Sequence, residues 1–193
     1  MENYKKNLDL LTKNHVYSKE MEHDACGVGL IASTEGKKSR AIVEYGIEAL
    51  KAVWHRGAVD ADGKTGDGAG IHVEIPKDFF IEKIQVTGHD YDNSEICVGM
   101  IFLPRNDYSA QESCKTIVES ELTKNNFSIY GWRQVPVNPK VLGEKALQTM
   151  PEIIQVLFKS NDPNLIDKNL ERKIYETRKK IENKAFELSL NNF

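Results

Sequence analysis

The stretch "EHDACGVGLIAS", residues 22–33, contains the first cysteine of the chain and the first apolar run that could form a strand. A single cysteine, Cys26, stands between a polar lead and an apolar run that carries two early glycines, Gly27 and Gly29. The apolar run is typical of a short strand that is buried on both faces. Glycines beside a cysteine let a ligand approach the backbone closely, so Cys26 is either a reactive thiol or an ordinary buried cysteine.

The composition of the 193 residues predicts a globular chain, with 40% hydrophobic and 28% charged residues. The formal net charge is -3, and like charges do not cluster in runs. This pattern argues against a nucleic acid or an anionic membrane surface as the main partner. No apolar run approaches the roughly 20 residues that a membrane-spanning helix needs.

The polar lead, residues 1–25, carries four lysines and five acidic residues. A secretory signal needs an apolar region of about 7–15 residues, and the lead contains none. We therefore expect a cytoplasmic protein, and we place the only clear boundary of the chain at Cys26.

Periodicity predicts a mixed α/β chain. Strands are expected at residues 26–33, 71–76, 96–104, 127–137 and 152–158. Helices are expected at residues 40–55, 109–124 and 168–188, and the second has the spacing of a capping box from Ser109 to Glu112. Layers of strands and helices follow from this order.

The three cysteines, Cys26, Cys97 and Cys114, form no CxxC pair, so neither a zinc site nor a disulfide framework is predicted. Cys97 lies in a predicted strand and Cys114 on the apolar face of a predicted helix. Both are interpreted as small buried hydrophobic residues.

A second group of candidate residues lies in "WHRGAVDADGKTGDGAG", residues 54–70. Arg56 either complements the dipole at the end of a helix or presents its planar guanidinium to a carboxylate. The glycine-rich loop does not match GxxxxGK[ST] or a complete GxGxxG that opens a helix, so a nucleotide site is not favoured. Its aspartates lack the ligand spacing and the closing Glu of a calcium loop.

Together, "EHDACGVGLIAS", "ALKAVWHRGAVDADGKTGDGAGI" and "GWRQVPV" resemble the start of the large chain of glutamate synthases. The resemblance is to their class II glutamine amidotransferase domain, which carries an N-terminal cysteine, and it runs from about residue 22 to the end. It implies an α+β fold, the αββα sandwich of N-terminal-nucleophile proteins. We expect residues 1–25 to be a propeptide and residues 26–193 to form only the N-terminal half of the domain.

The resemblance also implies the roles of individual residues. After removal of the leader, Cys26 would be the catalytic nucleophile, with its own α-amine, of pKa about 7.7–8.0, as the base. Arg56 would hold the α-carboxylate of L-glutamine. Trp132 and Arg133 are interpreted as structural. The loop from Thr65 to Gly70 would lie beside Arg56 in a supporting role, and its substrate-binding residues would be Thr65, Gly66, Asp67 and Gly68.

The implied reaction releases ammonia from the side-chain amide of glutamine, and the parent enzyme uses that ammonia to aminate 2-oxoglutarate. FMN and an iron–sulfur cluster are implied for the full-length parent, and no cofactor is expected in this segment. The implied partners are L-glutamine, the remainder of the large chain and a small subunit.

One departure from the family affects the expected activity. The family stabilises its oxyanion with an Asn-Gly pair, and no Asn-Gly dipeptide occurs in this sequence. Losing one such donor costs on the order of 10²–10³ in rate, so we expect the chain alone to be a fragment with little activity. Two alternatives stay open: a non-catalytic binding or scaffold module, and a thiol hydrolase that pairs Cys26 with His23 or His55.

Overall fold

The computed structural model describes residues 2–14 and 27–190. The chain divides into two compact units, and each is described by itself. The first unit comprises Met1–Ala58 and Gly66–Ile71, and the second comprises Val59–Thr65 and His72–Phe193. Within the described ranges, no helix is both long enough and apolar enough to cross a membrane.

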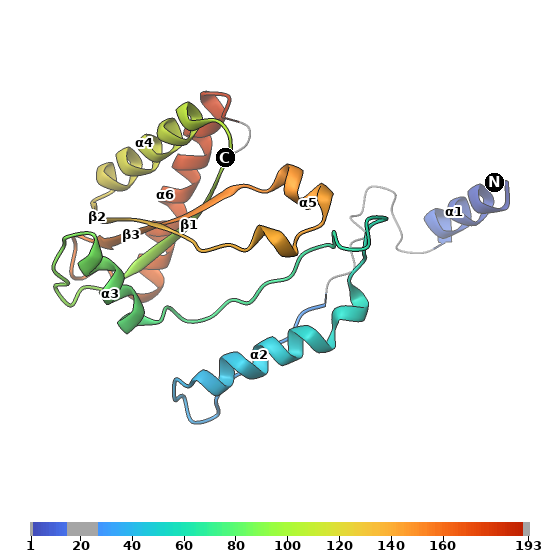
Figure 1. Ribbon diagram of the computed structural model, residues 1–193, viewed down its shortest axis with the longest axis horizontal. Helices are drawn as coiled ribbons and strands as arrows, with labels where there is room; N and C mark the ends of the chain where they lie inside the picture. Colours follow the sequence, from blue (N-terminus) through green and yellow to red (C-terminus); the bar gives the residue numbers. More distant parts are fainter. Residues whose placement is uncertain (1, 15–26, 191–193) are drawn as a thin grey trace. The chain divides into compact units, whose positions relative to one another are not determined.

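The first unit contains two helices and a short 3-10 turn (Figure 1). α1 (Glu2–Asn14) lies in the polar lead and was not predicted, whereas α2 (Arg40–Ala52) confirms the helix expected there. α2 ends before the predicted limit because the chain tightens into η1 (Trp54–Arg56). Residues 27–33 were predicted as a strand but have no strand partner in the part of the chain that the structure describes.

The second unit is built on a three-stranded sheet of order β1-β3-β2, with β3 antiparallel to both neighbours. The strands are β1 (Cys97–Leu103), β2 (Phe127–Gln134) and β3 (Glu152–Ser160). All three lie where the sequence predicts strands. The strand predicted at residues 71–76 is not formed, since no described strand pairs with that segment.

Two long helices, α4 (Tyr108–Lys124) and α6 (Asp167–Glu187), lie on one face of this sheet (Figure 1). The apolar cluster beneath them includes Val118, Leu122, Val156 and Phe158, each at most 3% exposed. α6 confirms its prediction. α4 begins slightly earlier than expected because the carboxylate of Asp107, and not the predicted capping box, accepts the N–H of Ala110 at 2.9 Å.

The opposite face of the sheet is covered in part by α3 (Lys77–Val86), which was not predicted. Ile84 of α3 packs there with Leu157 and Tyr130. Two further short elements, η2 (Pro139–Val141) and α5 (Glu144–Thr149), lie between β2 and β3 in the sequence. The second unit therefore has an antiparallel sheet between helices, which confirms the predicted α+β class.

A β-bulge interrupts β2 between Ile129 and Gly131. Gly131 has φ +147°, and the Thr87 side chain lies directly against it, with its hydroxyl donating to the carbonyl oxygen of Tyr130 at 2.7 Å. A side chain at position 131 would collide with Thr87, so the bulge requires glycine.

Candidate active site

The segment around Arg56 is a tight turn. Arg56 ends η1, and the N–H of Gly57 donates to the carbonyl oxygen of Trp54 at 3.0 Å. A Cβ at Gly57 would lie 3.3 Å from that same oxygen, so the turn leaves little room for a larger residue. Cys26, the predicted nucleophile, lies outside the described residues, as does His23.

Within the first unit, the Arg56 turn and the glycine-rich loop are in direct contact. The N–H of Ala58 donates to Oδ2 of Asp67 at 2.8 Å. Gly66 approaches so closely that a Cβ there would lie 3.2 Å from the carbonyl oxygen of Ala58. Gly68, at φ +85°, adopts a backbone conformation that favours glycine. Three of the predicted substrate-binding residues thus lie on a loop that is tied to the chain two residues after Arg56.

Thr65, the remaining predicted loop residue, belongs to the second unit and is fully engaged by its own turn. Its hydroxyl donates to Oδ2 of Asp62 at 2.5 Å, and its N–H donates to Oδ1 at 2.7 Å. These bonds, the side-chain bond from Thr65 first among them, hold the pKa of Asp62 well below its usual range. Asp62 was considered only as a calcium ligand in the sequence, and the structure gives it this different partner.

His55 is the histidine within the described residues that the sequence offers as a partner for Cys26. Its Nδ1 lies 3.2 Å from the carbonyl oxygen of Ala52, one turn earlier in the same segment. The ring is exposed, and this contact within its own turn accounts for its position.

The two described cysteines are buried thiols. Cys97 is 4% exposed, and burial, together with nearby Glu95 and Glu171, raises its pKa to about 12. Cys114 has no exposed surface, and burial likewise raises its pKa. The thiolate is the reactive form of cysteine, so both side chains are unreactive near neutral pH.

Trp132 and Arg133 make contacts that agree with a structural role. The indole N–H of Trp132 donates to Glu119 of α4 at 2.7 Å. The guanidinium of Arg133 donates to Gln155 at 2.7 Å and lies 5.1 Å from the ring centroid of Phe79.

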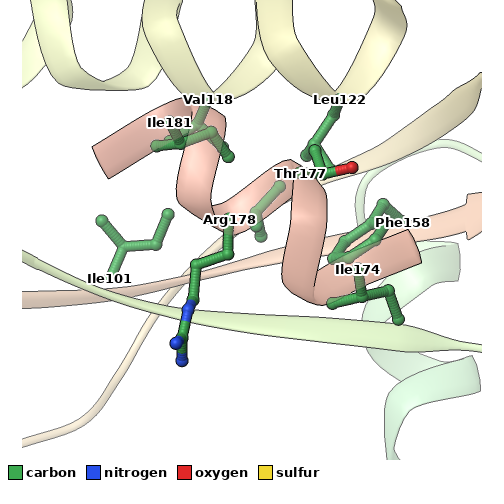
Figure 2. Close-up of a pocket in the computed structure, with 9 residues that line it drawn as sticks. Ile101, Val118, Leu122, Phe158, Ile174, Thr177, Arg178 and Ile181 are labelled. Carbon is green, nitrogen blue, oxygen red and sulfur yellow. The ribbon is translucent and has the colours of Figure 1, made fainter. Parts of the chain in front are cut away.

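A small cavity lies between α4, α6 and the sheet, and Figure 2 shows its lining. It has a volume of about 60 Å³, whereas ligand pockets commonly measure about 300–1,000 Å³. Its walls are mostly aliphatic, and its one hydroxyl, that of Thr177, donates to the carbonyl oxygen of Lys173. None of the nine lining residues is a predicted site residue, so the cavity is a packing gap and not a glutamine pocket.

The described residues do not fit an iron–sulfur cluster or another metal centre. They contain no group of three or more His, Cys, Asp or Glu side chains that could hold a metal ion. Iron–sulfur clusters are held by cysteine thiolates, and Cys97 and Cys114 are kept as buried thiols.

Comparison with known proteins shows which family the chain belongs to. The family model for "Glutamine amidotransferases class-II" matches residues 26–192. The "Glutamate synthase [NADPH] large chain" of Azospirillum brasilense is 50% identical over 98% of this chain and 12% of that protein. The "Ferredoxin-dependent glutamate synthase" of Pyropia yezoensis is 41% identical over 90% of this chain and 11% of that protein.

A third relative is "Ferredoxin-dependent glutamate synthase 1, chloroplastic/mitochondrial" of Arabidopsis thaliana, 40% identical over 83% of this chain and 10% of that protein. The chain thus spans about a tenth of the length of these relatives. The match bears out the resemblance found in the sequence. The mixed helices and small antiparallel sheet agree with part of an N-terminal-nucleophile fold.

Proposed function

The chain belongs to the class-II glutamine amidotransferases, and from this membership we propose that it is a glutamine-hydrolysing part of a glutamate synthase. The observation that carries the proposal is the bond from Ala58 N–H to Asp67, which ties the loop of Gly66 and Gly68 to the turn that bears Arg56. Arg56 and this loop are the two elements that the family resemblance assigns to substrate binding.

In the proposed mechanism, residues 1–25 are removed and Cys26 becomes the first residue. The family match begins at the same residue, which supports this boundary. The new α-amine has a pKa of about 7.7–8.0 and accepts the thiol proton of Cys26 near neutral pH. While Ala25 is attached, the same nitrogen is an amide and cannot act as a base.

The thiolate of Cys26 then attacks the side-chain amide carbon of L-glutamine. The C–N bond breaks, the departing nitrogen takes the proton held by the α-amine, and ammonia leaves a γ-glutamyl thioester. Water attacks the thioester, releases glutamate and restores the thiol. Arg56 holds the substrate α-carboxylate through charge-assisted hydrogen bonds, which fixes the amide carbon relative to the nucleophile.

The proposal also concerns the larger enzyme to which this domain would belong. The ammonia would serve the amination of 2-oxoglutarate in a cytoplasmic enzyme that includes the remainder of the large chain and a small subunit. The flavin and the iron–sulfur cluster implied for that enzyme are assigned to no residue of this chain.

The intact mass of the purified chain, before and after treatment with 6-diazo-5-oxo-L-norleucine, tests the nucleophile and the substrate site. This glutamine mimic alkylates a thiolate with loss of N₂, so labelling does not require the oxyanion donors of amide hydrolysis. We expect loss of residues 1–25 and one adduct on Cys26. Cys97 and Cys114 should stay unmodified because both are buried thiols.

Cys26→Ala is the control, and it should remove the adduct without changing the far-UV circular dichroism of the chain. A full-length mass without any adduct would contradict the proposal. That outcome would favour the alternative, a non-catalytic binding or scaffold module of the same family.

Turnover of glutamine is a separate prediction, because this sequence contains no Asn-Gly dipeptide to supply oxyanion donors. Supplying in trans the region that follows the matched part in the Azospirillum brasilense relative should raise ammonia release by about 10²-fold or more. The same addition to Cys26→Ala should release none. Equal rates with and without the added region would contradict this account of the donors.

A further inference from the structure

Residues 60–65, which we name the Asp62 turn, are organised by one carboxylate. Oδ1 of Asp62 accepts the N–H of Lys64 at 2.9 Å and the N–H of Thr65 at 2.7 Å, while Oδ2 accepts the Thr65 hydroxyl. The N–H of Asp60 donates to the carbonyl oxygen of Thr65 at 2.7 Å, which closes the turn across its base. Thr65 is therefore fixed by its N–H, its carbonyl oxygen and its hydroxyl.

A distant segment of the second unit, residues 143–145, contacts this turn at three points. The N–H of Glu144 donates to the carboxylate of Asp62. The ammonium of Lys145 lies 2.6 Å from Oδ2 of Asp60, although the two residues are 85 positions apart in the sequence. A Cβ at Gly143 would lie 2.5 Å from the backbone nitrogen of Thr65.

The contact at Gly143 allows no larger residue. A Cβ essentially never comes within 3.0 Å of another heavy atom, and the atoms that it would meet are the Thr65 hydroxyl, the Asp62 carboxylate and the backbone nitrogen of Thr65. Any side chain at position 143 must therefore displace Thr65 or the start of α5. The Asp62 turn and residues 143–145 are thus in close contact within the second unit.

We propose that Asp62, held by residues 143–145, is a positioning residue that orients Thr65 within the proposed substrate-binding loop. The inference rests on the proposed function of that loop. It also assigns Thr65 a role other than the direct substrate binding that the family resemblance implies. Since its hydroxyl is donated to Asp62, Thr65 does not offer that proton to the substrate.

Limited trypsin digestion tests the contact without reference to any activity. Lys64 lies inside the Asp62 turn, and its N–H is bound to Asp62, so cleavage after Lys64 should be slow in the wild-type chain. Gly143→Ala should speed that cleavage about tenfold or more relative to cleavage after Lys37, an exposed site in the first unit. Gly46→Ala is the matched control, since a Cβ at Gly46 meets nothing within 4 Å.

Labelling of Cys26 by 6-diazo-5-oxo-L-norleucine tests the positioning role. Asp62→Ala and Gly143→Ala should raise the reagent concentration needed for half-maximal labelling rate about tenfold or more. Labelling by iodoacetamide, which does not use the glutamine site, should keep its rate. Asp62→Asn retains one acceptor oxygen for the two N–H donors and should restore part of the lost affinity, which a merely structural disturbance would not predict.

The outcomes separate the inference from the proposed function. Faster cleavage after Lys64 with unchanged labelling by the glutamine mimic would overturn the positioning role and leave the proposed function in place. Equal cleavage of wild type and Gly143→Ala would overturn the close contact itself. A wild-type chain that iodoacetamide labels and the glutamine mimic does not would overturn the proposed function, and the positioning role with it.

Discussion

The two units of the chain differ in how they are stabilised. Of the first-unit residues whose exposure the structure describes, none is buried, and Val28 and Leu30 are 90% and 89% exposed. In the second unit, Leu157 and Ile84 have no exposed surface and lie in a packed core between sheet and helix.

Most of the predicted site residues and the apolar core therefore lie in different units of the chain. Of the motifs that resemble the family, the one around Arg56 lies mainly in the first unit, which has no described core, whereas "GWRQVPV" lies in the second. The unit that has the core carries only Thr65 among the predicted site residues. Local hydrogen bonds such as that from Ala58 to Asp67 therefore maintain the shape of the candidate site, whereas burial of apolar surface maintains the sheet.

The largest expected contrast is between two leucine truncations, one in each unit. Leu157→Ala should lower the free energy of unfolding by about 2–5 kcal/mol, because it opens a cavity beneath α3. Leu30→Ala should change it by less than about 0.5 kcal/mol, since the side chain is 89% exposed. Urea unfolding followed by circular dichroism measures both. Similar losses for the two variants would mean that Leu30 is buried in solution.

A pair of glycine substitutions gives the next contrast. Gly131→Ala combines an unfavourable φ of +147° with a Cβ that would lie 2.9 Å from Cβ of Thr87. It should destabilise the second unit by about 1–3 kcal/mol. Gly46→Ala, in α2 of the first unit, should leave the urea midpoint unchanged. A Gly131→Ala variant as stable as wild type would show that the bulge adjusts to a side chain.

Part of the pH dependence of the free energy of unfolding should come from the carboxylate of Asp92. A hydrogen bond from Lys159, with further bonds from Ser94 and Tyr130, holds the pKa of Asp92 well below its usual range. A depressed folded-state pKa means that Asp92 contributes stability above the unfolded value of about 3.9, and that this contribution is lost as pH falls below it.

Asp92→Asn should therefore weaken the loss of stability between neutral pH and pH 3, measured by urea midpoints. We expect a difference of about 1 kcal/mol or less, because the Asp92 side chain is 45% exposed. An unchanged pH profile in Asp92→Asn would assign the acid sensitivity to other carboxylates.

The smallest expected effect comes from the two tryptophans, one in each unit. Trp54 is 74% exposed, whereas Trp132 packs against the cluster beneath α4 and α6. Trp54→Phe should shift stability by less than about 0.5 kcal/mol, and the remaining Trp132 fluorescence should report a cooperative transition. In Trp132→Phe, the emission of Trp54 should change gradually with urea. A shared sharp midpoint for both probes would merge the two units into one cooperative structure.

Elements whose signal is local could be predicted from the sequence. The strands at residues 97–103, 127–134 and 152–160 and the helix at residues 167–187 follow their hydrophobic periods closely. The helices at residues 2–14, 77–86 and 144–149 were missed: the first is largely polar, and the last is only six residues long. The strands expected at residues 26–33 and 71–76 depend on partners, which periodicity cannot supply.

In the candidate site, too, the local motifs could be predicted from the sequence and the contacts between distant segments could not. Arg56 and the loop from Thr65 to Gly68 could be found because their residue types and order resemble a family. The bond from Ala58 to Asp67 and the contact of Gly143 with Thr65 join segments whose separation carries no periodic signal. An isolated glycine before a short helix, as at Gly143, gives no indication of which distant backbone it meets.

The bulge in β2 also determines which side chains of that strand face which layer. Beyond it, Trp132 pairs with Val156 and turns toward the helices, while Arg133 pairs with Gln155 on the opposite side. Regular pairing of the same residues without the bulge would shift the register beyond Ile129 by one residue and exchange these two directions, placing a guanidinium under α4 and α6. The bulge thus lets Ile129 and Trp132, which are three positions apart, face the same layer of the second unit.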